Sequence, residues 1–382
     1  MKASLRSSVD PFRAMDVMAK ANQMAAAGER VISLAVGQPA APAPSLAIGA
    51  ARAMLEHGRI AYTDALGRME LRERIARHYG ERYGQSIGAE RVMVTTGSSA
   101  GFNLAFIAAF DPGDRVAIAA PGYPAYRNIL KALGLEPVEI EVSVTDGYVL
   151  DADRLAAEHA LKPLQGVLIA SPSNPTGTVT PRETLRELIA FADREGIRFI
   201  SDEIYHGLVY GEAEATALEF SDSPIIVNSF SKYYCMTGWR VGWLVLPPSL
   251  VRAAERLGQN LYISAPELSQ AAALAVFDAT DELESIKAGY RQNRDLMMER
   301  LPQLGFSQIA PIDGAFYAYA AIPPGQGTAS EWSARLLEQA HVALTMGVDF
   351  DLRRGEAFAR LSYACSHAEL VEALDRIAAQ LA

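Results

Sequence analysis

The middle of the chain alternates short apolar runs with segments of helical pattern, and this alternation restricts the fold more than any other feature of the sequence. Such alternation is typical of βαβ units on a mainly parallel sheet. The expected strands are at residues 91–95, 115–119, 166–170, 198–201, 225–228 and 242–246. The expected helices around them are at residues 70–83, 100–110 and 184–195. The sequence therefore predicts an α/β fold with a mostly parallel central sheet.

The pattern changes after about residue 280, where a long polar helix replaces the alternation. The elements expected from there on are a helix at 282–301, a strand at 315–320, a loop at 323–327 and helices at 330–339 and 368–381. This order predicts a smaller α+β domain, which the N-terminal segment 11–28 joins. We therefore predict a large domain of residues 40–285, and a small domain made of residues 1–39 together with 286–382.

Charge and histidine usage argue against several classes of protein. The formal net charge is −10 over 382 residues, and no run of five basic residues occurs. We therefore expect neither nucleic acid nor an anionic membrane surface as a partner. The six histidines show no metal-ligand spacing, so we also expect no metal site.

Two features favour a cytoplasmic protein. The two cysteines, Cys235 and Cys365, lie far apart in the sequence, which is typical of a reducing compartment. Residues 1–10 carry two basic residues with no apolar core after them, so we expect no signal peptide. The apolar stretch 101–110 is shorter than the roughly 20 residues that a membrane span needs.

Lys232 is the residue that most directly indicates a chemistry. It ends the run Asn-Ser-Phe-Ser-Lys at 228–232, and Gly-Trp-Arg follows at 238–240. The lysine amine can condense with an aldehyde to form a Schiff base, and the guanidinium of Arg240 can bind a phosphate through two hydrogen bonds. Pyridoxal phosphate (PLP) needs both partners. Taken alone the pattern is weak, because most lysines are simply solvated.

Two further motifs follow strands and could contact the same cofactor. Ser98 and Ser99 lie between a strand and a helix, where free backbone N–H groups and hydroxyls form a site for an anion such as phosphate. Tyr123 lies in the turn 121–126 and could stack on an aromatic ring. The ordinary alternatives are a Gly-Ser turn for the first motif and a packed tyrosine for the second.

The ends of the next two strands supply the remaining contacts. Asn174, in Ser-Pro-Ser-Asn-Pro-Thr-Gly at 171–177, could donate a hydrogen bond to a phenolate oxygen, although Asn-Pro is usually only a turn. Asp202 could keep a pyridine nitrogen protonated, and its alternative is a helix cap. Tyr205 could reach the ring oxygen. Because ligands bind at the carboxyl ends of strands in open α/β sheets, these motifs together predict a PLP site.

Over residues 31–381 the chain resembles the class I/II aminotransferases, the PLP enzymes of fold type I. The motifs that carry the resemblance are Ser-Pro-Ser-Asn-Pro-Thr-Gly, Asp-Glu-Ile-Tyr at 202–205, and Ser-Phe-Ser-Lys with the later Gly-Trp-Arg. The resemblance implies a three-layer αβα large domain beside the smaller α+β domain. It also implies ping-pong transamination, in which an amino acid gives its amino group to a 2-oxo acid.

The resemblance also assigns roles by position. It implies that Lys232 binds the cofactor aldehyde and is catalytic together with Asp202 and Tyr205. The residues implied to contact the cofactor are Ser98, Ser99, Tyr123, Asn174, Asp202, Tyr205, Ser229, Lys232 and Arg240. Tyr62 is similar to a tyrosine that reaches the phosphate from the neighbouring subunit, which implies a homodimer with shared active sites.

Three positions are implied to contact the substrate: Gly37, Asn174 and Arg360. Arg360 matches the arginine that pairs with the substrate α-carboxylate. No second arginine stands out for a distal carboxylate, and Ser98 stands where some aspartate-specific relatives have lysine. The residues that suggest an apolar or aromatic pocket are Tyr62, Tyr126, Phe316 and Tyr317. We therefore expect a neutral donor, with 2-oxoglutarate or pyruvate as the acceptor.

Two alternatives remain open. The nearer one is a PLP-dependent carbon–sulfur β-lyase on the same fold, which would release pyruvate and ammonia from cysteine conjugates without a 2-oxo acid. The more distant one is a PLP-binding regulatory protein. A departure from the family is Met346, which replaces a proline that the family often has before its final arginine motif.

Overall fold

A computed structural model describes residues 2–382 and leaves Met1 outside. Its largest element is a seven-stranded sheet with the strand order β2-β8-β7-β6-β5-β3-β4. The strands are β2 (Val92–Thr95), β3 (Arg115–Ala120), β4 (Glu136–Glu141), β5 (Gly166–Ala170), β6 (Arg198–Asp202), β7 (Ile225–Ser229) and β8 (Gly242–Val245). Only the pairings of β8, with β2 and with β7, are antiparallel. The prediction of a mostly parallel central sheet is therefore confirmed.

The sequence analysis missed β4, which lies at the edge of the sheet. Its sequence, Glu-Pro-Val-Glu-Ile-Glu, mixes three glutamates and a proline with only two β-branched residues, and its side chains are at most half-buried. Charges and proline are typical of an edge strand, because they prevent pairing with another chain. The same features disguise the strand when only apolar runs are sought.

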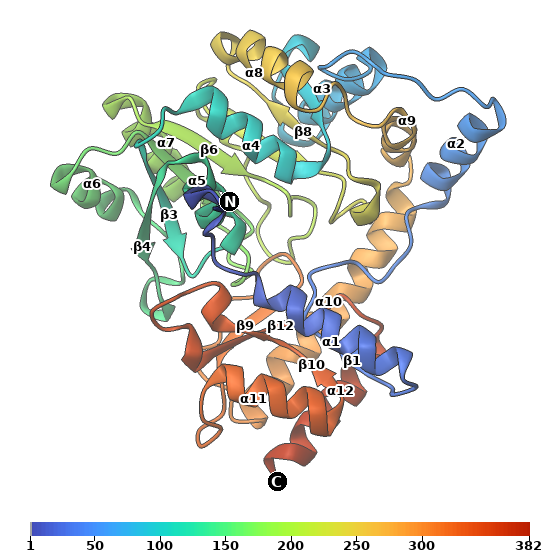
Figure 1. The fold of residues 1–382 in the computed structure, drawn as a ribbon, viewed down its shortest axis with the longest axis vertical. Coiled ribbons are helices and arrows are strands. Elements are labelled where there is room, and N and C mark those ends of the chain that lie inside the picture. The colour runs from blue at the N-terminus through green and yellow to red at the C-terminus, as the bar shows by residue number, and fades with distance from the viewer. Residues whose placement is uncertain (1) are drawn as a thin grey trace.

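Helices cover both faces of this sheet (Figure 1). Phe199 and Ile200 are neighbours on β6 and pack into different cores, because successive strand residues point to opposite faces. One core includes residues of α3 (Met69–Tyr83), α6 (Ala152–Leu161), α7 (Arg182–Glu195) and α9 (Glu267–Val276), with α2 (Ser45–Glu56). The other includes α4 (Gly97–Ala109), α5 (Pro124–Leu133) and α8 (Pro248–Leu261). The arrangement is the predicted three-layer αβα fold.

The rest of the chain builds a separate layer around a three-stranded antiparallel sheet, β11-β12-β9. Its elements are α1 (Arg13–Ala26), β1 (Ile32–Ser33), α10 (Thr280–Gln303), β9 (Tyr317–Ala321), α11 (Ala329–Arg335), β10 (Val342–Ala343), β11 (Thr345–Met346), β12 (Phe358–Ser362) and α12 (His367–Leu381). The N-terminal strand β1 pairs in parallel with β10, so the two ends of the chain share this layer. Figure 1 shows α1 beside the orange and red elements, below the large sheet.

The division into residues 40–285, and 1–39 with 286–382, stays a prediction. The helix α10 runs without a break through the proposed boundary at residue 285. None of the helices within residues 2–382 is both long and apolar enough to cross a membrane.

Candidate active site

A cavity of about 410 Å³ lies where the carboxyl ends of the central strands meet the second layer. Its size is within the usual range for small-molecule and cofactor sites. The predicted site residues that line it are Gly37, Ser98, Ser99, Tyr123, Asn174, Asp202, Tyr205, Lys232, Arg240 and Arg360. They come from turns after five different strands of the large sheet, from β12, and from the segment after β1. Residues that lie far apart in the sequence therefore meet in one cavity.

Lys232 is held as a reactive amine. Its Nζ donates a hydrogen bond to the Gly37 carbonyl at 2.6 Å and lies 5.7 Å from the centroid of the Tyr205 ring. The pKa of Lys232 is lowered to about 8, mainly by burial and also by the nearby Arg360 and Arg240, while Asp202 opposes the change. An amine with this pKa is partly unprotonated near neutral pH, which is the form that attacks a carbonyl carbon.

Asp202 is a buried carboxylate at the end of β6. Oδ1 accepts from the Ile204 backbone N–H at 3.1 Å, and Oδ2 accepts from the hydroxyl of Tyr126. Burial raises the pKa of Asp202 to about 6, against the lowering by these hydrogen bonds and by Lys232. Among the described residues no cation forms a salt bridge with it. A protonated ring nitrogen would supply the missing positive charge.

Arg240 and the start of α4 form an anion-binding cradle. Gly97 has φ +76°, and a Cβ there would lie 2.5 Å from the Arg240 Nη2, so only glycine lets the guanidinium approach this closely. Ser98 and Ser99 follow in the first turn of α4, where backbone N–H groups are free of helical partners. A guanidinium above a helix N-terminus suits a phosphate. The cavity therefore fits PLP at its aldehyde, nitrogen and phosphate contacts.

Arg360 is a buried guanidinium that pairs with no carboxylate of residues 2–382. It is 2% exposed; its Nη1 donates to the Asn174 Oδ1 at 3.0 Å and its Nη2 to the Ala35 carbonyl at 2.5 Å. Its Nε has no hydrogen-bond partner within the described residues. The Arg360 guanidinium carbon also lies 4.4 Å from the centroid of the Tyr317 ring. A buried cation in this state fits an incoming carboxylate, while Asn174 keeps its NH₂ group free to donate elsewhere.

Two of the residues predicted to contact the cofactor lie away from the cavity lining. Tyr62 is 79% exposed at the surface. Ser229 is buried behind the cavity, where its Oγ lies 2.9 Å from the Oγ of Ser231 and accepts from the Ser231 N–H at 3.1 Å. Ser231, which the sequence analysis did not single out, lines the cavity instead.

Comparison of the chain with known proteins identifies its family. The family model described as "Aminotransferase class I and II" matches residues 29–377. The chain belongs to this family. It is 45% identical to valine–pyruvate aminotransferase of Mycobacterium tuberculosis, over 100% of this chain and 98% of that protein. The resemblance seen in the motifs is thus confirmed.

Solved aminotransferase structures have the same fold. A crystal structure of an aminotransferase from Mycobacterium tuberculosis matches with a TM-score of 0.97 and 45% identity, covering 100% of this chain and 99% of that one. The aspartate aminotransferase from Thermus thermophilus with maleate matches with a TM-score of 0.93 and 32% identity, covering 100% of both chains. The protein is therefore an aminotransferase, which moves an amino group between an amino acid and a 2-oxo acid, and the predicted reaction class is confirmed.

Several features of this aminotransferase site were not predicted. The sequence analysis placed Tyr126 in the pocket but did not pair it with Asp202; its position three residues after Tyr123, one helical turn away, was the available signal. The hydroxyl of Tyr317 lies 2.8 Å from that of Tyr205 and fills the space where a Cβ on Gly37 would stand. Phe316 does not line the cavity; it is fully buried behind Tyr205.

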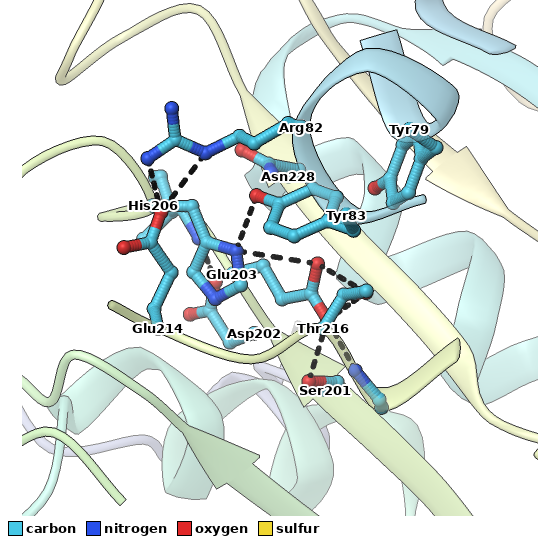
Figure 2. A network of polar contacts seen from close by, with 12 residues as sticks. Tyr79, Arg82, Tyr83, Ser201, Asp202, Glu203, His206, Glu214, Thr216 and Asn228 are labelled. Atoms are coloured by element: carbon cyan, nitrogen blue, oxygen red, sulfur yellow. Dashed lines mark hydrogen bonds and ion pairs between the residues drawn. The ribbon is translucent and has the colours of Figure 1, made fainter. Parts of the chain in front are cut away.

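A buried polar network lies behind the site, beside Asp202 (Figure 2). Glu203 accepts from the Ser201 Oγ at 3.2 Å, from the Thr216 Oγ1 at 2.9 Å and from the Ala217 N–H at 3.0 Å. Burial raises the pKa of Glu203 to about 8, while these hydrogen bonds oppose the change. The aminotransferase thus has two adjacent buried carboxyl groups, of which Asp202 faces the cavity and Glu203 the network.

The network continues through His206 to a surface-reaching ion pair. The Nδ1 of His206 lies 2.7 Å from the Tyr83 hydroxyl, and burial lowers the pKa of His206 to about 4. Glu214 accepts from the Gly207 N–H at 2.9 Å and pairs with Arg82. Glu203 ties the start of the turn 203–207 to the Ala217 N–H, and Glu214 binds the end of that turn at the Gly207 N–H. Together they hold the segment that carries Tyr205.

Proposed function

We propose that this aminotransferase uses PLP and prefers an amino donor with a neutral, aliphatic or aromatic side chain. The observation that supports the donor class is the set of cations in the cavity. Among the described lining residues these are Lys232, Arg240 and Arg360. The first is needed for the cofactor aldehyde, the second for its phosphate, and the third for the α-carboxylate. No cation is left for a carboxylate in the side chain, so a buried acidic side chain would be unpaired.

Each residue proposed to hold the cofactor carries a group of the chemistry that its contact requires. Asp202 would bind the ring nitrogen, Asn174 and Tyr205 the ring oxygen, and Tyr123 the ring face. Arg240 with Ser98, Ser99 and the start of α4 would bind the phosphate, and Lys232 the aldehyde carbon. When bound, PLP supplies an electron sink for the bond broken at the substrate α-carbon.

The protein side chains then orient the substrate and move its proton. Arg360 binds the α-carboxylate through the side of its guanidinium that lacks a partner. Lys232 Nζ removes the proton from the α-carbon, since its lowered pKa leaves it partly unprotonated. Asp202 keeps a negative charge beside the ring nitrogen. Because one Arg360 receives both carboxylates, the donor must leave as a 2-oxo acid before the acceptor binds, which gives ping-pong kinetics.

We also propose a homodimer in which Tyr62 completes the neighbouring site. Tyr62, Ile60 and Ile263 are large exposed apolar side chains, 79%, 47% and 49% exposed. Their two loops are joined, because the Ala61 N–H donates to Glu267 and the Thr63 N–H to Ser264. A second copy would cover this surface. Sedimentation of the loaded enzyme should give a dimer, and Ile263→Arg should shift it toward the monomer; a wild-type monomer with full activity would contradict the proposal.

We also propose a cytoplasmic location. Cys235 and Cys365 are both free thiols, and burial raises the pKa of each, Cys235 to about 12 and Cys365 to about 11. Unpaired, unreactive cysteines are typical of a reducing compartment.

A donor screen tests the proposed specificity. The relative from Mycobacterium tuberculosis is named for valine and pyruvate, so these are the first pair to assay, beside alanine, leucine, phenylalanine, aspartate and glutamate. We expect kcat/KM for the best neutral donor to exceed that for aspartate at least about tenfold. A preference for aspartate would overturn the donor class. Release of pyruvate and ammonia from a cysteine conjugate without an acceptor would favour the β-lyase alternative.

A further inference from the structure

We propose that the first turns of α1 are the surface that selects the substrate side chain, and that they favour extended or branched aliphatic groups. We call this surface the α1 wall and define it as Phe12, Ala14, Met15 and Met18. The inference rests on the proposed function, because it assumes that the substrate occupies the cavity of Lys232 and Arg360.

The α1 wall is apolar and faces the reactive groups. All four of its residues line the same cavity as Lys232 and Arg360. Phe12, Met15 and Met18 are three residues apart, so they lie on one face of the helix. The charged residues of this segment, Arg13, Asp16 and Lys20, are not among the lining residues. The wall therefore offers a ligand apolar contact and no ionic partner.

The position of the α1 wall is fixed from behind. The carboxylate of Asp349 accepts hydrogen bonds from the Arg13 N–H at 3.1 Å and from the Ala14 N–H at 2.8 Å, and so caps the helix from a distant part of the chain. Further along, Ala21 packs into a small core with Ala35, Leu337 and Ala343. The backbone of the wall is thus anchored before any substrate binds.

The wall also lies near the expected cofactor ring. The ring of Phe12 meets that of Tyr123 edge to face, with centroids 6.0 Å apart and an angle of 78°. Tyr123 is the residue proposed to stack on the cofactor. A substrate whose carboxylate is on Arg360 and whose α-carbon is near Lys232 would thus direct its side chain toward a cavity bounded by Phe12.

The two methionines have the properties of a binding surface rather than of a core. Met15 is 46% exposed, so a large part of its side chain is free to be covered by a ligand. Methionine is flexible and polarisable, and it adapts to apolar groups of different shape. Met24, on the same helix, packs instead against the core of Ala21 and its neighbours. The helix therefore carries a matched control for a methionine that only stabilises the fold.

Kinetics with two donors that differ only in side-chain size test the inference. The ratio of kcat/KM for leucine to that for alanine is measured in the PLP-loaded wild type, in the double variant Met15→Ala/Met18→Ala, and in Met24→Ala. We expect the ratio to fall about tenfold in the double variant, because the larger side chain loses its contacts. We expect it to stay unchanged in Met24→Ala. An unchanged ratio in an active double variant would overturn the inference.

Binding of a non-reacting ligand gives a second, independent readout. The probe is 4-methylpentanoate, which has the carbon skeleton of leucine without its amino group, compared with propanoate by calorimetry. We expect the affinity for 4-methylpentanoate alone to fall about tenfold in the double variant, and equal affinities for both proteins would contradict the wall. If the wild type prefers aspartate, the proposed donor class fails, while this titration still decides whether the α1 wall binds an aliphatic chain.

Discussion

Two regions of the cavity differ in almost every physical property. We define its polar floor as Lys232, Asp202, Asn174 and Arg360. These residues are polar and bound to groups far away in the sequence, and all but the half-buried Lys232 are buried. The α1 wall is apolar, comes from one short segment and leaves Met15 nearly half exposed. The difference suggests a division of labour, in which the floor performs the reaction and the wall selects its substrate. Changes to the floor should therefore affect every donor, and changes to the wall only some of them.

Removing the floor's unpaired cation should have the largest effect. In Arg360→Ala the α-carboxylate loses its charged partner, and truncating a buried charge pair typically costs about 2–5 kcal/mol. We expect kcat/KM to fall by about 100-fold or more for every donor alike, with PLP still bound. Steady-state kinetics with leucine and alanine and a cofactor titration measure this.

The control for Arg360 is Arg353→Ala, which removes an arginine with a 70% exposed side chain that pairs with Glu141 at the surface. It should leave kcat/KM nearly unchanged. Loss of PLP in Arg360→Ala, or a loss confined to large donors, would show that Arg360 does not belong to the floor as defined.

A smaller effect is expected where the floor is supported by one hydrogen bond. Tyr126→Phe removes the hydroxyl that donates to Asp202, which should raise the pKa of Asp202 further above its present value of about 6. The carboxylate then binds the ring nitrogen less well, and we expect the PLP dissociation constant to rise about tenfold. Tyr148→Phe is the control, because its hydroxyl faces the Gln308 carbonyl. Equal PLP affinity in wild type and Tyr126→Phe would contradict a role of the Tyr126 hydroxyl in cofactor binding by Asp202.

The smallest effect concerns stability rather than catalysis. Glu203 has a folded pKa of about 8, above its ordinary value of 4.5. Its contribution to stability is fully present below pH 4.5 and is lost as the pH rises toward 8, because the folded state keeps a proton that the unfolded state releases. Glutamine has no proton to lose. Compared with wild type, Glu203→Gln should therefore gain stability between pH 5.5 and pH 8.5.

Thermal unfolding of both proteins at the two pH values measures this gain. Each unit by which the folded pKa exceeds the unfolded one corresponds to about 1.4 kcal/mol, so a rise of several degrees in relative Tm is within reach. Glu187→Gln, at an exposed position of α7, is the control and should show no such pH dependence. A Glu203→Gln protein that follows the wild type at both pH values would contradict a protonated Glu203.

The floor could be predicted from the sequence and the wall could not, for a physical reason. Asp202 ends a strand, and Lys232 and Asn174 each follow one. The chemistry of PLP requires these residue types at one edge of the sheet. The order of the motifs in the sequence was therefore sufficient to predict these site residues. Met15 and Met18 lie in an amphipathic helix, where apolar residues usually pack in a core. The contacts that hold α1 against the cavity come from distant parts of the chain: Asp349, 335 residues from Ala14, caps the helix, and Ala21 packs against Leu337 and Ala343.

The same limit applies to smaller details of the site. Glu203 follows Asp202 directly, and from the sequence an acidic residue at this position is expected to be solvated. The buried network around it depends on Thr216 and His206, which belong to no sequence motif. Phe316 and Tyr317 are neighbours and both aromatic, yet only Tyr317, the first residue of β9, lines the cavity, while Phe316 lies in the turn before the strand. Ser231, in the turn after β7, lines the cavity, whereas Ser229, the last residue of β7, is buried.

The central claim is that the amine of Lys232 holds the cofactor. The most direct test is to reduce the PLP-saturated enzyme with borohydride, digest it, and locate the phosphopyridoxyl group by tandem mass spectrometry, with Lys232→Ala treated in parallel. We expect the group on the peptide that contains Lys232, none in the variant, and no transamination by the variant. A saturated enzyme in which Lys232 stays unmodified, or in which another lysine carries the group, would contradict the account.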